Sequence, residues 1–191
     1  MTNNDGGTAF GLWQDATSRY MYFDVMNEIL PCLPEHALIG KIADYGGGNG
    51  VLKTFLPDAI TIDCDTEKRP DIVDDILTHE GDYDTIFLRY VLHYLNDYEV
   101  LGLFRHIATF HKGCIVVIQF INHDLHVKYA NSVGETKYFR TREQLQALLP
   151  LQHNLRITRT YRVTKEFYRN RLGNENATEH YEAIDLYLIM L

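Results

Sequence analysis

Short apolar segments with strand character alternate with segments of helical spacing along this 191-residue chain. The segment at 114–120, CIVVIQF, is apolar over most of its length, as in strands whose sheet is covered on both faces. Candidate strands are residues 41–45, 59–63, 71–75, 83–90, 114–120, 155–163 and 183–191, and candidate helices are 16–33, 51–57, 97–110 and 141–149. We therefore predict an α/β fold in which parallel βαβ units form a doubly wound sheet.

Two of the candidate helices carry specific signals. Residues 97–110 place Val100, Leu103 and Ile107 on one apolar stripe. Residues 141–149 begin with Thr141 and have Gln144 three positions later, which is the spacing of a capping box. Each segment is thus expected to begin at a defined residue and to pack one face against the sheet.

The length and composition favour a single domain over residues 1–191, without repeats or linkers. The three cysteines form no CxxC pair, so we expect neither a zinc site nor disulfides, and a reduced cytoplasmic setting. The amino-terminal sequence lacks a signal peptide, and no apolar run is long enough to cross a membrane. A net charge of −8 disfavours a nucleic-acid substrate, because binding to phosphates requires an excess of cations.

A glycine cluster, DYGGGNG at residues 44–50, follows the first candidate strand. Glycines let a backbone turn tightly and approach a ligand, and the next helix would direct its amino terminus to the same place. The dinucleotide pattern G-x-G-x-x-G does not fit, because its third glycine would fall on Val51 or Lys53. The Gly-Lys-Ser/Thr of a phosphate-binding loop is also absent.

The D-x-G-x-G-x-G pattern of Asp44, Gly46, Gly48 and Gly50 resembles the first motif of class I S-adenosylmethionine-dependent methyltransferases. The resemblance extends over most of the chain. It implies a Rossmann-like sheet of seven strands, six parallel and the last antiparallel, with helices on both faces. It also implies S-adenosylmethionine as cofactor and S-adenosylhomocysteine as product, with these four residues facing the methionine end.

Acidic residues stand where this family binds the rest of its cofactor. Asp63 ends the second candidate strand, where a carboxylate can accept both ribose hydroxyls, and Asp65 is the alternative. The family commonly places an acid and an apolar residue at the third strand for the adenine ring. Asp75 and Ile76 match these positions best, and Asp74 is an alternative.

Two arginines complete the predicted cofactor site. Arg89 lies at the end of the fourth candidate strand, and Arg19 can pair with the carboxylate of the cofactor.

The stretch LRYVLHYLND at 88–97 resembles small-molecule O-methyltransferases of the caffeate and hydroxyindole type. In those enzymes the histidine that matches His93 is the general base for the acceptor hydroxyl, a role that suits a neutral imidazole. The family's acid at the end of strand five is replaced here by Gln119, and its amino-terminal dimerisation domain is absent. A purely structural role for His93 is the alternative.

Further residues are candidates for the acceptor pocket. Trp13 and Tyr20 belong to residues 1–35, which we expect to form a helical lid over the site. Tyr168, Arg169 and Arg171 lie in the connection between the last two strands, where arginine can recognise carboxylate or phosphate. Aromatic core residues and a solvated charged loop are the alternatives.

The sequence predicts transfer of a methyl group to a small molecule, directed to oxygen and belonging to specialised metabolism. N- or C-methylation and S-adenosylmethionine binding without methyl transfer are the alternatives. The residues Asn122 to His126 are interpreted as a polar loop, so no metal is predicted. No nucleic-acid or membrane partner is expected, and the oligomeric state is left open.

Overall fold

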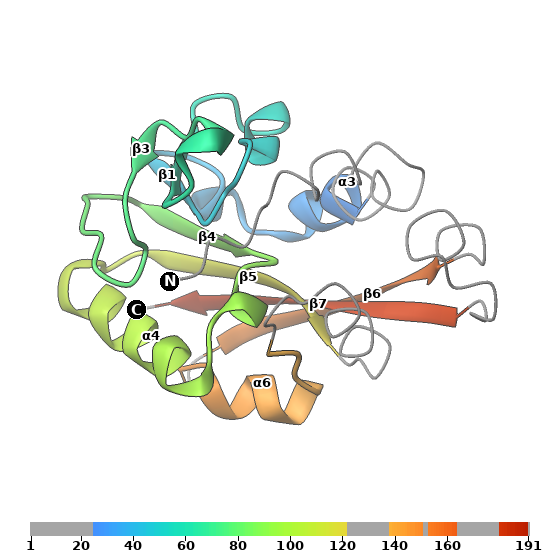
Figure 1. Ribbon diagram of the computed structural model, residues 1–191. Coiled ribbons are helices and arrows are strands. Elements are labelled where there is room, and N and C mark those ends of the chain that lie inside the picture. Colours follow the sequence, from blue (N-terminus) through green and yellow to red (C-terminus); the bar gives the residue numbers. More distant parts are fainter. Residues whose placement is uncertain (1–24, 122–137, 151–152, 164–179, 191) are drawn as a thin grey trace.

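A computed structural model describes residues 25–121, 138–150, 153–163 and 180–190 of the chain. For residues 153–163 and 180–183 it describes the backbone alone. Figure 1 shows one mixed sheet with helices packed against it. No helix in these ranges is long and apolar enough to cross a membrane.

The strands form one sheet in the order β3-β2-β1-β4-β5-β7-β6. Their bounds are β1 Ile42–Tyr45, β2 Ile60–Asp63, β3 Ile72–Val73, β4 Thr85–Arg89, β5 Cys114–Ile121, β6 His153–Val163 and β7 His180–Met190. The neighbours from β3 to β5 are parallel, and β7 is antiparallel to both β5 and β6. These pairings confirm a Rossmann-like, mostly parallel sheet whose last strand is antiparallel.

The α-helices of the described residues are α3 Val25–Ile29, α4 Asp97–Phe110 and α6 Arg142–Leu148. The 3-10 turns are Leu30–Cys32, Glu35–Ala37, Val51–Thr54, Thr66–Lys68 and Leu92–Tyr94. The prediction for 97–110 is confirmed, as is the capping box of Thr141 and Gln144. Of the candidate helix 16–33, the described part contains α3 and one 3-10 turn.

The prediction of a helix over 51–57 was wrong, because the chain forms a 3-10 turn over Val51–Thr54 there. Gly50 enters this turn in the left-handed conformation, and the N–H of Phe55 donates to the carbonyl of Leu52. The N–H of Leu56 makes one α-helical bond to Leu52 at 2.9 Å, and Pro57, the next residue, has no N–H to continue it.

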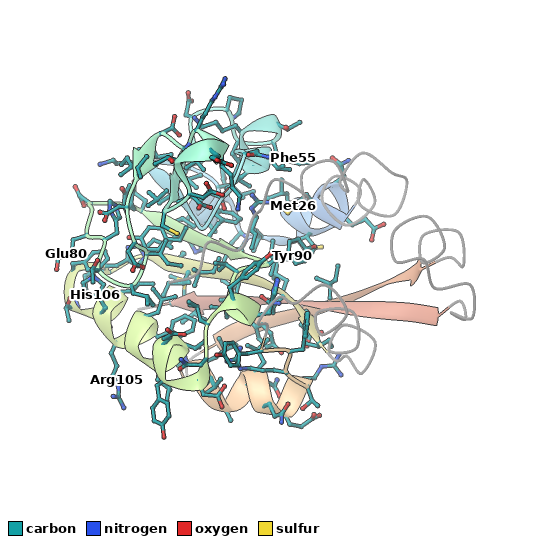
Figure 2. All side chains as sticks on the ribbon, viewed as in Figure 1. Met26, Phe55, Glu80, Tyr90, Arg105 and His106 are labelled. Carbon is teal, nitrogen blue, oxygen red and sulfur yellow. The ribbon has the colours of Figure 1, made fainter. Side chains whose placement is uncertain are left out.

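The buried side chains form two clusters. One contains Met26 and Ile29 of α3 together with Phe87 and Val116 of the sheet. The other contains the apolar stripe of α4, Leu145 of α6, and sheet residues that alternate with those of the first cluster, such as Ile86 and Val117. This alternation follows from the period of two in a strand. Figure 2 shows Met26 near Tyr90, and both belong to the first cluster.

The carboxyl ends of the parallel strands meet at one edge of the sheet, where ligands bind in folds of this kind. Within β7, Ala183 pairs with Ile121, the last residue of β5, so His180 lies beyond that edge. β6 ends at Val163, paired with His180. The β6–β7 ribbon therefore projects past the edge that carries the glycine cluster, as Figure 1 shows.

Candidate functional site

The glycine cluster forms a tight loop between β1 and the 3-10 turn at Val51–Thr54. Gly46, Gly48 and Gly50 have φ angles of 67°, 55° and 72°, which favour glycine. The N–H groups of Gly46 and Gly47 donate to the carbonyl of Ile62 at 2.8 and 3.3 Å. These bonds hold the loop to the neighbouring strand β2.

Gly47 also has to be glycine, although it is a variable position of the motif. A Cβ at Gly47 would lie 2.6 Å from the carboxylate of Asp44 and 2.8 Å from the methyl of Thr61. A Cβ at Gly48 would meet only the side chain of Lys68, at 3.6 Å. The inner side of the loop is therefore filled by the protein, whereas Gly48 is less crowded and its nearest neighbour is the flexible side chain of Lys68.

Asp63, at the end of β2, is bonded directly to this loop. Its carboxylate accepts the N–H of Gly48 and the N–H of Asp65, both at 2.9 Å, and the residue is 7% exposed. The carboxylate of Asp65 accepts the N–H of Glu67 and so begins the following 3-10 turn. Of the two alternatives for the ribose-binding acid, Asp63 is the one that contacts the glycine loop.

Asp44 and Arg89 bind each other beneath the loop. Arg89 Nε and Nη2 donate to the two carboxylate oxygens of Asp44 at 3.1 and 2.6 Å, and both side chains are buried. Such a bidentate pair joins the ends of β1 and β4. Neighbouring strands bring both residues to this edge, where their side chains bind each other. A contact of either with a cofactor stays a prediction.

The segment after β3 is held by its own polar contacts. His79 Nδ1 lies 2.8 Å from Asp74, and His79 Nε2 lies 2.9 Å from the hydroxyl of Tyr83. The bond to His79 lowers the pKa of Asp74. The carboxylate of Asp75 accepts the N–H of Leu77 at 3.0 Å.

Ile76 packs in the second core cluster, and its contact with a cofactor stays a prediction. Val73 pairs with Asp63 in the register of β2 and β3 and is 55% exposed. The pairing of the two strands, which the sequence does not display, places Val73 beside Asp63.

His93 lies in the 3-10 turn after β4 and is 6% exposed. Its Nδ1 is 3.0 Å from Nε2 of Gln119, on β5. The ring of Phe139 stacks on the imidazole at 5.4 Å with an interplanar angle of 8°. Phe139 was missed by the sequence analysis, because 46 positions separate it from His93 (139 − 93). Tyr90, between β4 and His93, has a φ of 54°, a strained value for a residue with a side chain.

The contact with Gln119 bears on which ring nitrogen of His93 carries the proton. As oriented, Oε1 of Gln119 is buried and has no hydrogen-bond partner among the described residues. The oxygen and the NH₂ group of an amide are similar in size, so the amide can turn by 180° without displacing its neighbours. With Oε1 turned to His93, the ring would donate from Nδ1 and keep Nε2 as proton acceptor.

Several predicted residues lie outside the described part of the chain. These are Trp13, Arg19, Tyr20, Tyr168, Arg169, Arg171 and the polar loop from Asn122 to His126. Within the described ranges, no group of three or more His, Cys, Asp or Glu side chains is arranged to hold a metal ion.

No protein-family model matches this chain, and no curated protein sequence is similar to it. Solved structures are similar in fold. One is magnesium protoporphyrin IX methyltransferase from Synechocystis PCC 6803 with bound S-adenosylhomocysteine, with a TM-score of 0.58 and 15% identity over 95% of this chain and 94% of that one. The chain has the fold of S-adenosylmethionine-dependent methyltransferases.

Two further structures share this fold. A possible histamine N-methyltransferase from Thermotoga maritima has a TM-score of 0.61 and 12% identity, over 97% of this chain and 95% of that one. The mitomycin 7-O-methyltransferase MmcR has a TM-score of 0.56 and 14% identity, over 94% of this chain and 60% of its own length. Their names describe different acceptors, so the shared fold does not specify an acceptor atom.

Proposed function

We propose that this chain transfers the methyl group of S-adenosylmethionine to a small molecule. The observation that carries the proposal is the bond from Gly48 N–H to the carboxylate of Asp63, at the carboxyl edge of the sheet. It joins the less crowded side of the glycine loop to an acid that can accept ribose hydroxyls. The names of the solved structures that share the fold support the same cofactor.

The residues at this edge fit such a cofactor. A carboxylate has roughly four acceptor positions, and the two N–H groups bonded to Asp63 leave room for two vicinal hydroxyls. Val73 offers an exposed apolar surface beside Asp63 for the adenine ring. Asp75, with Asp74 as the alternative, would accept the adenine amino group, and Arg19 would pair with the cofactor carboxylate.

The chemistry requires little beyond alignment and one base. The bound cofactor would supply a methyl group carried on a sulfonium. The thioether that remains is a neutral leaving group, so no acid is needed to protonate it. His93 would take the proton of an acceptor hydroxyl at Nε2 while Gln119 holds Nδ1. The contact of Nδ1 with Gln119 supports this O-directed form of the proposal. N- or C-methylation and cofactor binding without transfer are the other forms.

The acceptor pocket is assigned to segments outside the described residues. Trp13 and Tyr20 of the amino-terminal lid, and Tyr168, Arg169 and Arg171 of the β6–β7 connection, are proposed to line it. The projection of the β6–β7 ribbon past the carboxyl edge supports the second assignment. We also assign to the whole chain the doubly wound, seven-stranded form with helices on both faces.

Titration calorimetry with S-adenosylhomocysteine tests the cofactor, and we expect a dissociation constant in the micromolar range. Heat with NAD but none with S-adenosylhomocysteine would overturn the proposal. Transfer from methyl-labelled cofactor to pools of phenols, carboxylates and amines then tests the acceptor class. In the O-directed form, His93→Gln should lower turnover about 10²–10⁴-fold with nearly unchanged cofactor affinity. Unchanged turnover would favour an acceptor that needs no base.

A further inference from the structure

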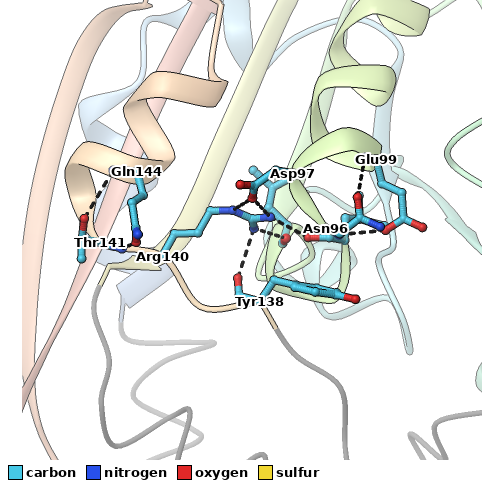
Figure 3. Close-up of polar contacts among 9 residues, drawn as sticks. Asn96, Asp97, Glu99, Tyr138, Arg140, Thr141 and Gln144 are labelled. Carbon is cyan, nitrogen blue, oxygen red and sulfur yellow. Dashed lines mark hydrogen bonds and ion pairs between the residues drawn. The ribbon is translucent and has the colours of Figure 1, made fainter.

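Arg140 precedes Thr141, the N-cap of α6, and every N–H group of its side chain donates a hydrogen bond within the protein. Nη1 donates to the carbonyls of Leu92 and Tyr138 at 2.8 and 3.1 Å. Nη2 donates to the carbonyl of Leu95 and to Asp97, both at 2.7 Å, and Nε donates to Asp97 at 2.9 Å. A guanidinium has five such donors, so this one is saturated. Figure 3 shows these bonds.

The accepting carbonyls lie on both sides of His93. Leu92 precedes it in the 3-10 turn, and Leu95 ends that turn. The N–H of Tyr138 donates to the carbonyl of His93 itself at 2.7 Å, and Phe139 stacks on its ring. Three consecutive residues, 138–140, therefore contact the backbone and the ring of the His93 segment.

Both ends of this connection begin well-defined helices. Asn96 accepts the N–H of Glu99 at 3.0 Å while Glu99 accepts the N–H of Asn96 at 2.7 Å, a capping box at the start of α4. Thr141 and Gln144 form the same arrangement at the start of α6. Arg140 thus joins two fixed helix starts across the turn that carries His93 (Figure 3).

We propose that Arg140 is a positioning residue for His93, acting through the carbonyls of Leu92 and Leu95. The inference rests on the proposed role of His93 as base. Without the guanidinium these carbonyls lose buried donors, and the turn can shift the imidazole away from Gln119. Asp63 and the glycine loop share no hydrogen bond with Arg140, so we expect a change at Arg140 to affect cofactor affinity less than the His93 ring.

The planar fork of Arg140 is the property that matters. It reaches two carbonyls of one turn, a third from Tyr138 and a carboxylate at fixed angles, which a lysine ammonium cannot do. Arg140→Lys should therefore keep the charge and lose the positioning. Asp97→Ala should have a smaller effect, because it removes only one partner of the guanidinium. The side chain of Asp97 is itself largely exposed.

The test is nitrogen NMR of imidazole rings in protein labelled with ¹⁵N-histidine, with the His93 signals assigned by His93→Gln. We expect Arg140→Lys to change the tautomer balance and the apparent pKa of His93, with the other histidine signals unchanged. Turnover should fall about 100-fold, as for a base misplaced by roughly 1 Å, with S-adenosylhomocysteine affinity within about twofold of wild type. Asp97→Ala should shift the same signals in the same direction by less.

Arg105→Lys is the matched control, because it makes the same substitution at an exposed arginine of α4. It should leave both the melting temperature and the His93 signals unchanged. Unchanged His93 signals in folded Arg140→Lys would overturn the inference, as would equal changes in Arg105→Lys. If Arg140→Lys does not fold, Asp97→Ala decides by the same criterion. Wild-type protein that binds no S-adenosylhomocysteine would contradict the proposed function, while the NMR comparison would still decide the positioning.

Discussion

The glycine loop and the His93 turn lie at the same edge of the sheet but are held in different ways. The loop is held by the strands themselves, through the carbonyl of Ile62 and the carboxylate of Asp63 on β2. The turn contacts Gln119 of β5 and is held in addition by residues 138–140, outside the sheet, with Arg140 bonded to Leu92 over a separation of 48 residues. The loop is therefore as fixed as β1 and β2, whereas the turn depends on how residues 138–140 pack.

This difference suits the two halves of the proposed reaction. A cofactor common to many acceptors is best bound by the part of the site that belongs to the sheet. An acceptor that differs between enzymes is best met by loops, which change without altering the sheet. The comparison predicts that substitutions in the loop change stability and cofactor affinity. Substitutions in the turn should instead change the position and the NMR signals of the His93 ring.

The largest expected effect comes from breaking the buried pair under the glycine loop. Arg89→Met leaves the carboxylate of Asp44 buried without its bidentate partner, which should cost about 3–5 kcal/mol of unfolding free energy. Urea unfolding followed by circular dichroism measures it. Lys53→Met removes a pair that is partly exposed, with Asp71, and should cost less than about 1 kcal/mol. Equal losses in the two variants would contradict the assignment of the first pair to the core.

The next effect concerns cofactor affinity. Asp63→Ala should weaken binding of S-adenosylhomocysteine by about 1.5–3 kcal/mol, since it removes a charged hydrogen-bond acceptor and the bond that holds Gly48. Calorimetry on Asp63→Ala and Asp65→Ala makes the comparison, and Asp65→Ala should have the smaller effect. A larger loss for Asp65→Ala would identify Asp65 as the ribose-binding acid.

A smaller effect is expected at the helix that follows the turn. Asn96→Ala removes the capping side chain of α4 and should cost about 1 kcal/mol of unfolding free energy. Thr141→Ala, at the matching cap of α6, should cost a similar amount. If the turn depends on its neighbouring helices, both variants should also shift the NMR signals of His93. Shifts in neither variant would show that Arg140 holds the turn without help from the caps.

The smallest expected effect is on the pH dependence of stability, to which a second buried histidine, His111, contributes. Burial lowers the pKa of His111 below its ordinary 6.5, so the folded state favours the neutral ring. Its contribution to stability is present above pH 6.5 and is lost as the pH falls from there through the folded-state pKa. His111→Gln should therefore reduce the slope of unfolding free energy between about pH 7 and 5.

The exposed His36 supplies the control for that slope, because His36→Gln should leave it unchanged. Any pH dependence of turnover that persists in His111→Gln can then be assigned to the site. If the unfolding free energy of His111→Gln has the same slope against pH as that of the wild type, groups other than His111 cause the loss of stability at low pH.

The sequence by itself determined the order and type of most elements. The stripe of Val100, Leu103 and Ile107 predicted α4 over its observed bounds, and Thr141 with Gln144 predicted the start of α6. The strands were located within about two or three residues at most ends. These features depend on periodicity and on contacts three or four residues apart, which a linear sequence displays directly.

Only the tertiary structure decided which side chains meet. Asp44 was expected at the cofactor and is paired with Arg89, because parallel pairing of β1 and β4 sets Asp44 opposite Phe87, two residues before Arg89 on the same face. Val73 lies beside Asp63, while Ile76 is in the core, since strand register determines which side chains share a face. Arg140 reaches the His93 turn because α4 and α6 pack on the same side of the sheet. Such partners are set by strand order and packing, which bring distant residues together without leaving a repeating pattern in the sequence.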